Sequence, residues 1–227
     1  MKGNPLALVV GANRGVGLGV VEAFLARGWD VVATARRPEA ADVLRALPRV
    51  TVLPLEMTDG ATLDAFSGLL KNRMLDAVLI NAGIAGPAHR SANVATEAEI
   101  GHLMFVNAIA PIRLAKGLIG SLRQGAGVLA FSSSIMGSIA LNGGGHELYR
   151  ASKAALNSLT RGLFNEVRGR GITLLTLHPG WVRTDMGGQG APVSVVESGR
   201  GIVSVIEAQA GRHGHRFLDY AGKEIAW

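Results

Sequence analysis

The feature that most constrains this chain is an apolar run that leads into a glycine-rich turn. Residues 6–10 predict a buried strand, Gly11, Gly15 and Gly17 follow, and apolar residues then recur at helical spacing over 15–27. Glycine admits unusual backbone angles, and the start of a helix presents free N–H groups and a partial positive charge, which suits a phosphate. The spacing G-x-x-x-G-x-G differs from the commoner G-x-G-x-x-G, so a nucleotide site and a simple tight turn both remain open.

The same alternation continues along the chain. Further strands are predicted at 31–35, 50–55, 75–80, 127–131 and 172–177, with a short seventh at 216–218. Helices are predicted near 15–27, 39–47, 60–72, 96–123, 147–169 and 194–209. Apolar strands that alternate with helices predict an α/β fold: one doubly wound, Rossmann-type domain over 1–227, with a parallel sheet of about seven strands and helices on both faces. Such a fold binds its ligand at the carboxyl ends of the strands.

Composition narrows the function classes. The 227 residues are 48% hydrophobic and 18% charged, which excludes a disordered chain, and the absence of cysteine excludes disulfides and thiolate metal sites. The net charge of +6 is scattered and aromatic residues make up 5%, so we expect no nucleic-acid partner. The predicted apolar runs fall short of the roughly 20 residues that span a bilayer, so we expect no membrane partner and a soluble, cytoplasmic protein. His213 and His215 have no carboxylate cluster beside them, so no metal site is expected.

Polar residues that could carry chemistry follow the predicted strands, as the fold demands. They are Asn81-Ala82-Gly83, the serines 132–134 and His178-Pro179-Gly180. Tyr149 and Lys153 lie four residues apart in a predicted helix, which places both side chains on one face. A nearby ammonium lowers the pKa of a phenol, and the pair could then act as a general acid or base. Taken alone, a tyrosine and a lysine at this spacing are far more often an ordinary surface contact than a catalytic pair.

Six motifs, in order, resemble the short-chain dehydrogenase/reductase family from Leu6 to about Met186. They are the turn Gly11-xxx-Gly15-x-Gly17, Asn81-Ala82-Gly83, Asn107 within 105–111, Ser134 before Ile135-Met136-Gly137, the pair Tyr149 and Lys153, and Pro179-Gly180-Trp181-Val182-Arg183-Thr184. The phrases at 134–139 and 147–153 and the ending 219–227 resemble the small sniffer and C-factor-like carbonyl reductases.

The resemblance implies a mechanism in which NAD(P)H gives a hydride to a carbonyl carbon. Tyr149 would donate the proton to the oxygen, and Ser134 would hydrogen-bond that oxygen. Lys153 would lower the pKa of the tyrosine and hold the nicotinamide ribose, while Asn107 would help to seat a water that resupplies the proton. Among the adjacent serines, Ser134 is chosen for its distance from Gly137, and Ser133 remains the alternative.

The choice of cofactor follows from the end of the second strand. An acid commonly stands there to hold free ribose hydroxyls, but this chain has Ala35, followed by Arg36 and Arg37. Arg14 in the glycine turn adds another cation, and guanidinium groups suit a 2′-phosphate. We therefore expect NADP(H) in preference to NAD(H).

Cofactor-binding residues are expected from every one of these motifs. They are Gly11, Asn13, Arg14, Gly15, Val16, Gly17, Arg36, Glu56, Met57, Asn81, Ala82, Gly83, Tyr149, Lys153, Pro179, Gly180, Val182 and Thr184. Glu56 stands where the family has an aspartate that contacts adenine, and either it takes that role or Asp59 caps the next helix instead.

The sequence thus predicts an NADP(H)-dependent oxidoreductase that reduces a carbonyl of a small molecule to an alcohol, or the reverse. The alternative is a dinucleotide-binding sensor or signalling protein without turnover. A short segment at about 186–196 is expected to cover the substrate. Family analogy suggests a homo-oligomer, a dimer or tetramer, formed through the helices at 96–123 and 147–169.

Overall fold

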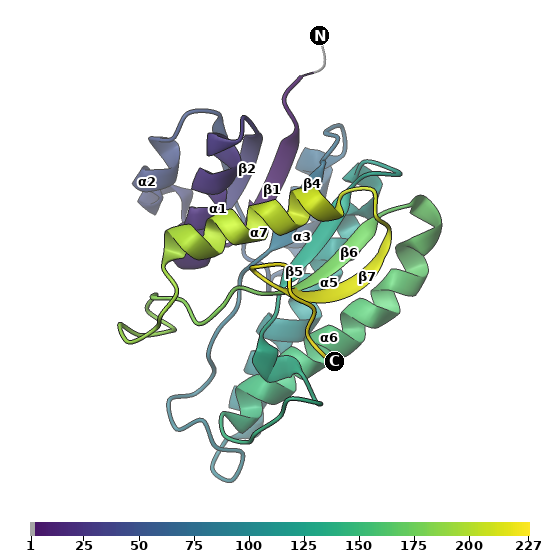
Figure 1. Cartoon of the computed structure of the whole chain (residues 1–227). Helices are drawn as coiled ribbons and strands as arrows, with labels where there is room; N and C mark the ends of the chain where they lie inside the picture. The colour runs from purple at the N-terminus through teal and green to yellow at the C-terminus, as the bar shows by residue number, and fades with distance from the viewer. Residues whose placement is uncertain (1–2) are drawn as a thin grey trace.

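The computed structural model describes residues 3–227, in which seven parallel strands form one sheet with helices on both faces (Figure 1). The strand order is β3-β2-β1-β4-β5-β6-β7, and every neighbouring pair is parallel. The strands are β1 (Leu6–Val10), β2 (Asp30–Ala35), β3 (Val50–Pro54), β4 (Ala77–Ile80), β5 (Val128–Ser132), β6 (Thr173–His178) and β7 (Gly214–Asp219). The predicted fold class is confirmed, and all seven predicted strands are present.

Helices connect the strands as the crossovers of a doubly wound sheet require. The α-helices are α1 (Gly15–Ala26), α2 (Asp42–Arg45), α3 (Gly60–Leu70), α4 (Glu97–Met104), α5 (Ala110–Leu118), α6 (Glu147–Val167) and α7 (Val195–Gln209). Helices α1, α2 and α7 pack on one face of the sheet, and α3, α5 and α6 pack on the other (Figure 1). Each face therefore has its own apolar core, and the strands are apolar throughout because both of their faces are buried.

The predicted helix at 96–123 is interrupted. It begins with a capping box, in which Thr96 and Glu99 bond each other's backbone N–H, and runs as α4. A π-helical turn, η2 (Phe105–Ile109), separates α4 from α5, and a 3₁₀ turn, η3 (Ile119–Ser121), follows the end of α5. Pro111 has no N–H to donate to the carbonyl four residues earlier, which is that of Asn107, and this accounts for a break in the regular pattern.

The stretch Glu97–Ser121 also tests the expectation that no apolar run is long enough to span a bilayer. Among residues 3–227, Glu97–Ser121 is the one helix that is long and apolar enough to cross a bilayer by length and composition alone, so the expectation that no run approaches this length was too strict. In the fold, 56% of its apolar window is buried inside the protein, against α3 and α6. Core packing therefore accounts for more than half of this apolar window.

Candidate active site

The glycine turn lies directly against the end of β4. Gly11 has a φ of +75°, and a Cβ atom there would lie 2.9 Å from the Cβ of Ala82. A Cβ on Gly17 would lie 2.1 Å from the Gly11 carbonyl oxygen, so a side chain at either position would force the backbone apart. The turn needs these glycines in order to bring α1 against β4.

The first turn of α1 is arranged to receive an anion. Arg14 occupies the N-cap position and makes no capping hydrogen bond with its side chain, and the first turn contains no acidic residue. The free N–H groups and the helix dipole are thus left for a negatively charged group. Arg14 Nη1 lies 2.5 Å from Asp185 Oδ2, and a Cβ on Gly15 would lie 3.2 Å from the methyl group of Thr184. The segment after β6 therefore lies over the turn.

Asn81 ties the turn to β5. Its amide nitrogen donates to the Gly11 carbonyl at 3.2 Å, and its Oδ1 accepts from the hydroxyl of Ser132 at 2.9 Å. Ser132 also accepts through its own carbonyl, from Lys153 Nζ at 2.8 Å. In the sequence Ser132 stands out only as part of the serine run, whereas in the structure it joins the asparagine to the lysine.

Lys153 and Tyr149 lie one turn apart on α6, and the buried face of that helix presents the lysine to the site. Lys153 Nζ lies 5.7 Å from the centre of the Tyr149 ring. A Cβ on Gly83 would lie 3.5 Å from Lys153 Nζ, so the end of β4 passes next to the ammonium. Gly137 packs on the backbone of α6, where a Cβ would lie 2.8 Å from the Lys153 carbonyl carbon.

The two candidate serines differ in their partners. The hydroxyl of Ser134 is within hydrogen-bond reach of the Tyr149 phenol, and it also accepts from Met136 N–H at 3.1 Å. The hydroxyl of Ser133 donates to Asn157 Oδ1 at 2.6 Å and is buried on the side of α6. The geometry therefore favours Ser134 over Ser133 as the partner of the tyrosine.

The pKa of Tyr149 does not shift in the direction that the sequence suggested. Burial raises it from about 10 to about 12, and the hydrogen bond with Ser134 offsets this only in part. Burial also lowers the pKa of Lys153 to about 8. The expected lowering of the phenol pKa by Lys153 is therefore wrong for this structure, because desolvation of the phenolate dominates and the ammonium is turned towards Ser132.

Asn107 is fully buried in the π-helical turn η2 and holds the chain after β4. Its amide nitrogen donates to the Ile84 carbonyl at 2.9 Å and to the Ser152 hydroxyl at 3.0 Å, and its Oδ1 accepts from Ile84 N–H at 2.9 Å. A carbonyl oxygen has two lone pairs, so this bond to Ile84 N–H leaves one acceptor position of Oδ1 unused. Ser152, which the sequence analysis missed, lies three residues beyond Tyr149 on the same helix.

The predicted adenosine residues lie at the ends of β2 and β3. Arg36 and Arg37 are exposed directly after β2, whose Thr34 hydroxyl accepts from Gly11 N–H at 3.1 Å. Glu56 Oε1 accepts from both the N–H and the hydroxyl of Thr58, at 3.1 and 2.8 Å. Asp59 caps α3 by accepting from Ala61 N–H at 3.0 Å, so the capping alternative holds for Asp59.

The remaining predicted residues flank these groups. Asn13 and Val16 belong to the turn, Met57 is buried beside Glu56, and Gly180 has a φ of +88° between Pro179 and Val182. Within residues 3–227, no group of three His, Cys, Asp or Glu side chains is placed to hold a metal ion. His213 is exposed at a φ of +56°, whereas the ring of His215 packs against that of Trp227 at 4.7 Å.

Comparison with known proteins decides the family. The family model described as short chain dehydrogenase matches residues 5–192. This chain is a short-chain dehydrogenase. As a member it is an oxidoreductase.

Individual relatives agree with this assignment. C-signal of Myxococcus xanthus is 39% identical over 155 residues, which cover 67% of this chain and 93% of that protein. A carbonyl reductase of Pseudomonas aeruginosa PAO1, solved in complex with NADP, is 42% identical with a TM-score of 0.91, covering 99% of this chain and 100% of that chain. Carbonyl reductase Sniffer of D. melanogaster is 31% identical with a TM-score of 0.87 over 100% of both chains. The resemblance to sniffer and C-factor-like proteins is confirmed.

Proposed function

We propose that this chain reduces the carbonyl group of a small aldehyde or ketone to an alcohol, or catalyses the reverse reaction, with NADP(H) as cofactor. The observation that carries the proposal is the contact of Tyr149 with Ser134, beside Lys153. Lys153 Nζ lies next to Gly83, and the preceding residue, Ala82, packs on Gly11 of the glycine turn. A proton donor, a hydrogen-bond partner and a phosphate-binding turn therefore open onto the same edge of the sheet.

The residues present fit a dinucleotide. The glycine turn and the uncapped start of α1 suit its pyrophosphate, and Arg14 and Arg36 suit a 2′-phosphate. Asn81, Ala82 and Gly83, together with Pro179, Gly180, Val182 and Thr184, border the expected place of the nicotinamide ribose. When bound, the reduced nicotinamide supplies the hydride. The structural relatives that were solved with NADP support the choice of cofactor.

The side chains of the site would divide the remaining chemistry. Tyr149, which is protonated at neutral pH as phenols are and whose pKa burial raises to about 12, donates its proton to the carbonyl oxygen. Ser134 hydrogen-bonds the same oxygen and stabilises the charge that develops on it. Lys153 holds the ribose through its ammonium. Asn107 uses its remaining acceptor position for the water that returns a proton to the tyrosine.

Replacement of the phenol tests this proposal. Tyr149→Phe should abolish NADPH oxidation in a screen of aldehydes, ketones, diketones and quinones, while NADPH binding, followed by fluorescence, remains within about twofold. Turnover that persists in this variant would contradict the assignment of the proton donor.

The cofactor preference has its own test. Arg36→Asp removes a cation and adds the acid that holds free ribose hydroxyls, so kcat/KM should shift from NADPH towards NADH by at least about tenfold. A wild-type protein that uses both cofactors equally, or prefers NADH, would contradict the NADP(H) proposal.

A signalling role without turnover is the second candidate, and one observation favours it: a relative with 39% identity bears the name C-signal. A wild-type protein that binds NADPH but reduces no carbonyl in the screen would support this candidate.

We also propose a homo-oligomer formed through the helices at 96–123 and 147–169, where Ile100 and Ile109 are exposed, and a cytoplasmic location. Light scattering that gives a monomer, or cell fractionation that finds the protein elsewhere, would contradict these proposals.

A further inference from the structure

The chain between β4 and α4, residues 84–96, forms a strap that begins at the active site. Its first residue, Ile84, is held through both its N–H and its carbonyl by the buried Asn107. Gly86, with a φ of +86°, lies so close to Leu103 that a Cβ would approach its side chain to 2.9 Å. The strap then extends below the carboxyl edge of the sheet, towards the lower end of α6 in Figure 1.

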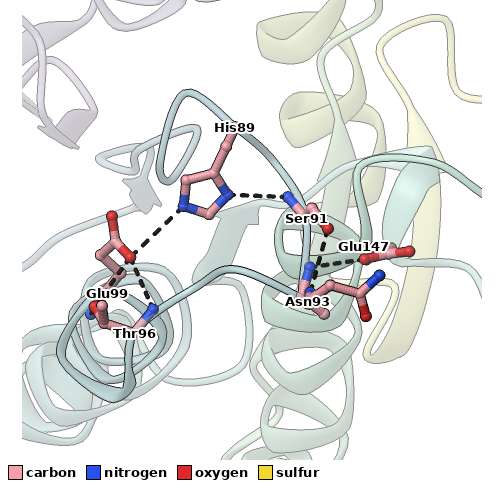
Figure 2. Close-up of polar contacts among 7 residues, drawn as sticks. His89, Ser91, Asn93, Thr96, Glu99 and Glu147 are labelled. Atoms are coloured by element: carbon pink, nitrogen blue, oxygen red, sulfur yellow. Dashed lines mark hydrogen bonds and ion pairs between the residues drawn. The ribbon is translucent and has the colours of Figure 1, made fainter.

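The middle of the strap is fastened to the helix that carries Tyr149. Glu147 is the first residue of α6, and its Oε2 accepts a hydrogen bond from Ala92 N–H at 2.8 Å, across 55 residues of sequence (Figure 2). Tyr149 lies two residues further along that helix. Hydrogen bonds to a charged carboxylate are among the stronger ones, and this bond connects the strap to the helix that carries the proposed proton donor, Tyr149.

The other side of the strap is fastened to α4. Glu99 Oε2 accepts from the N–H and the hydroxyl of Thr96, both at 2.9 Å, and lies 3.6 Å from His89 Nε2. His89 Nδ1 accepts from Ser91 N–H at 3.2 Å, one residue before Ala92 (Figure 2). The bonds from Thr96 lower the pKa of Glu99. Two carboxylates, one from each helix, therefore hold the two sides of the strap.

We propose that Glu147 is a positioning residue that fixes the strap beside Tyr149 and thereby sets the outer wall of the substrate mouth. This inference rests on the proposed reductase function. The strap would contact the portion of a large substrate that lies furthest from the reacting carbonyl. In the proposed reaction the carbonyl oxygen would lie between Tyr149 and Ser134, so a substrate of one ring would stay close to α6. A larger apolar substrate would extend outwards and meet the strap, in which the apolar side chain of Val94 is 64% exposed.

The bond between Glu147 and Ala92 can be removed and restored without a change to any group that touches the reacting atoms. Glu147→Ala removes the acceptor, whereas Glu147→Gln keeps an oxygen that can accept from Ala92 N–H. Glu97→Ala is the matched control, since it removes an exposed carboxylate from the first turn of α4 that makes no hydrogen bond to the strap among the described residues. The probes are benzaldehyde and the three-ring phenanthrenequinone, with NADPH as cofactor.

The strap predicts a split between the two probes. Glu147→Ala should raise the KM for phenanthrenequinone about three- to tenfold, the loss expected for one charge-assisted hydrogen bond near the surface. The kcat for benzaldehyde and the Kd for NADPH should stay within about twofold. Hydrogen exchange should accelerate within residues 84–96. Glu147→Gln and Glu97→Ala should resemble the wild type in all four measurements.

Other outcomes would overturn the inference. They are an equal change of KM for both probes, no change for either, or a Glu147→Gln variant that behaves like Glu147→Ala. A wild-type protein that reduces neither probe would contradict the proposed function itself. The exchange measurement, which needs no turnover, distinguishes that failure from the loss of the tether.

Discussion

At the scale of single residues, burial changes Tyr149 and Lys153 in opposite ways. The phenol pKa is raised to about 12 and the ammonium pKa is lowered to about 8, so both shifts favour the neutral forms. A phenol that stays protonated at neutral pH is suited to give a proton to a carbonyl oxygen, which is its role in reduction. The hydrogen bond from Ser134 favours the phenolate and offsets part of this shift.

Replacing each of the two neighbouring serines should therefore chiefly affect a different quantity: activity for Ser134 and stability for Ser133. Ser134→Ala removes the partner of Tyr149 and the acceptor for Met136 N–H, so it should lower kcat/KM about 10²- to 10³-fold and cost about 1 kcal/mol of unfolding free energy. Ser133→Ala leaves buried Asn157 Oδ1 without its donor at 2.6 Å and should cost about 1–3 kcal/mol of unfolding free energy, while most activity remains. Steady-state kinetics and urea denaturation of both variants check this. The reverse pattern would assign the active-site role to Ser133.

At the scale of elements, the contact between the turn after Ser134 and helix α6 fixes the spacing of the site. A Cβ on Gly137 would lie 2.8–2.9 Å from the backbone and Cβ of Lys153, whereas a Cβ on Gly162, further along the same helix, has nothing within 4 Å. Gly137→Ala should therefore destabilise the protein by about 1–3 kcal/mol and lower kcat, because it pushes Ser134 away from Tyr149. Gly162→Ala should stabilise it by about 0.5–1 kcal/mol.

Thermal unfolding and kcat of the two glycine variants give the comparison. Equal effects at Gly137 and Gly162 would show that helix propensity alone decides the outcome. A Gly137→Ala variant with normal kcat would show that the spacing between Ser134 and α6 does not limit the reaction.

Most elements could be predicted from the sequence because each strand is a short apolar run buried on both faces. The interruption of 96–123 at Asn107 was not predicted, since a π-helical turn depends on Pro111 together with tertiary hydrogen bonds. The main side chains of the site were found from motifs. Their supports, Ser132, Ser152 and Asn157, were not, because their partners come from other elements and only packing brings them together.

At the scale of the whole molecule, two histidines near the β6–β7 end of the sheet predict how stability depends on pH. Burial lowers the pKa of His178 and of His215 from 6.5 to about 4, and the Nδ1 atom of each is buried without a partner among the described residues. His215 Nε2 lies 3.0 Å from the Thr176 hydroxyl, so β6 and β7 share this ring. Both histidines are therefore neutral in the folded protein over a range in which the unfolded chain is protonated.

The sign of the effect follows from proton counting. Between pH 6.5 and about 4 the unfolded state binds more protons than the folded state, so the free energy of unfolding falls as the pH is lowered through this window. Each histidine contributes about 3 kcal/mol over this whole window, of which about 2 kcal/mol falls between pH 7 and pH 5. Urea denaturation at pH 7 and pH 5 should show the loss, and the double variant His178→Gln, His215→Gln should show a smaller one, even if it is less stable at pH 7. His102→Gln, an exposed change on α4, is the control. If the double variant loses as much free energy of unfolding between pH 7 and pH 5 as the wild type does, the acid sensitivity lies elsewhere. Protonation of these two rings on unfolding would then not be its cause.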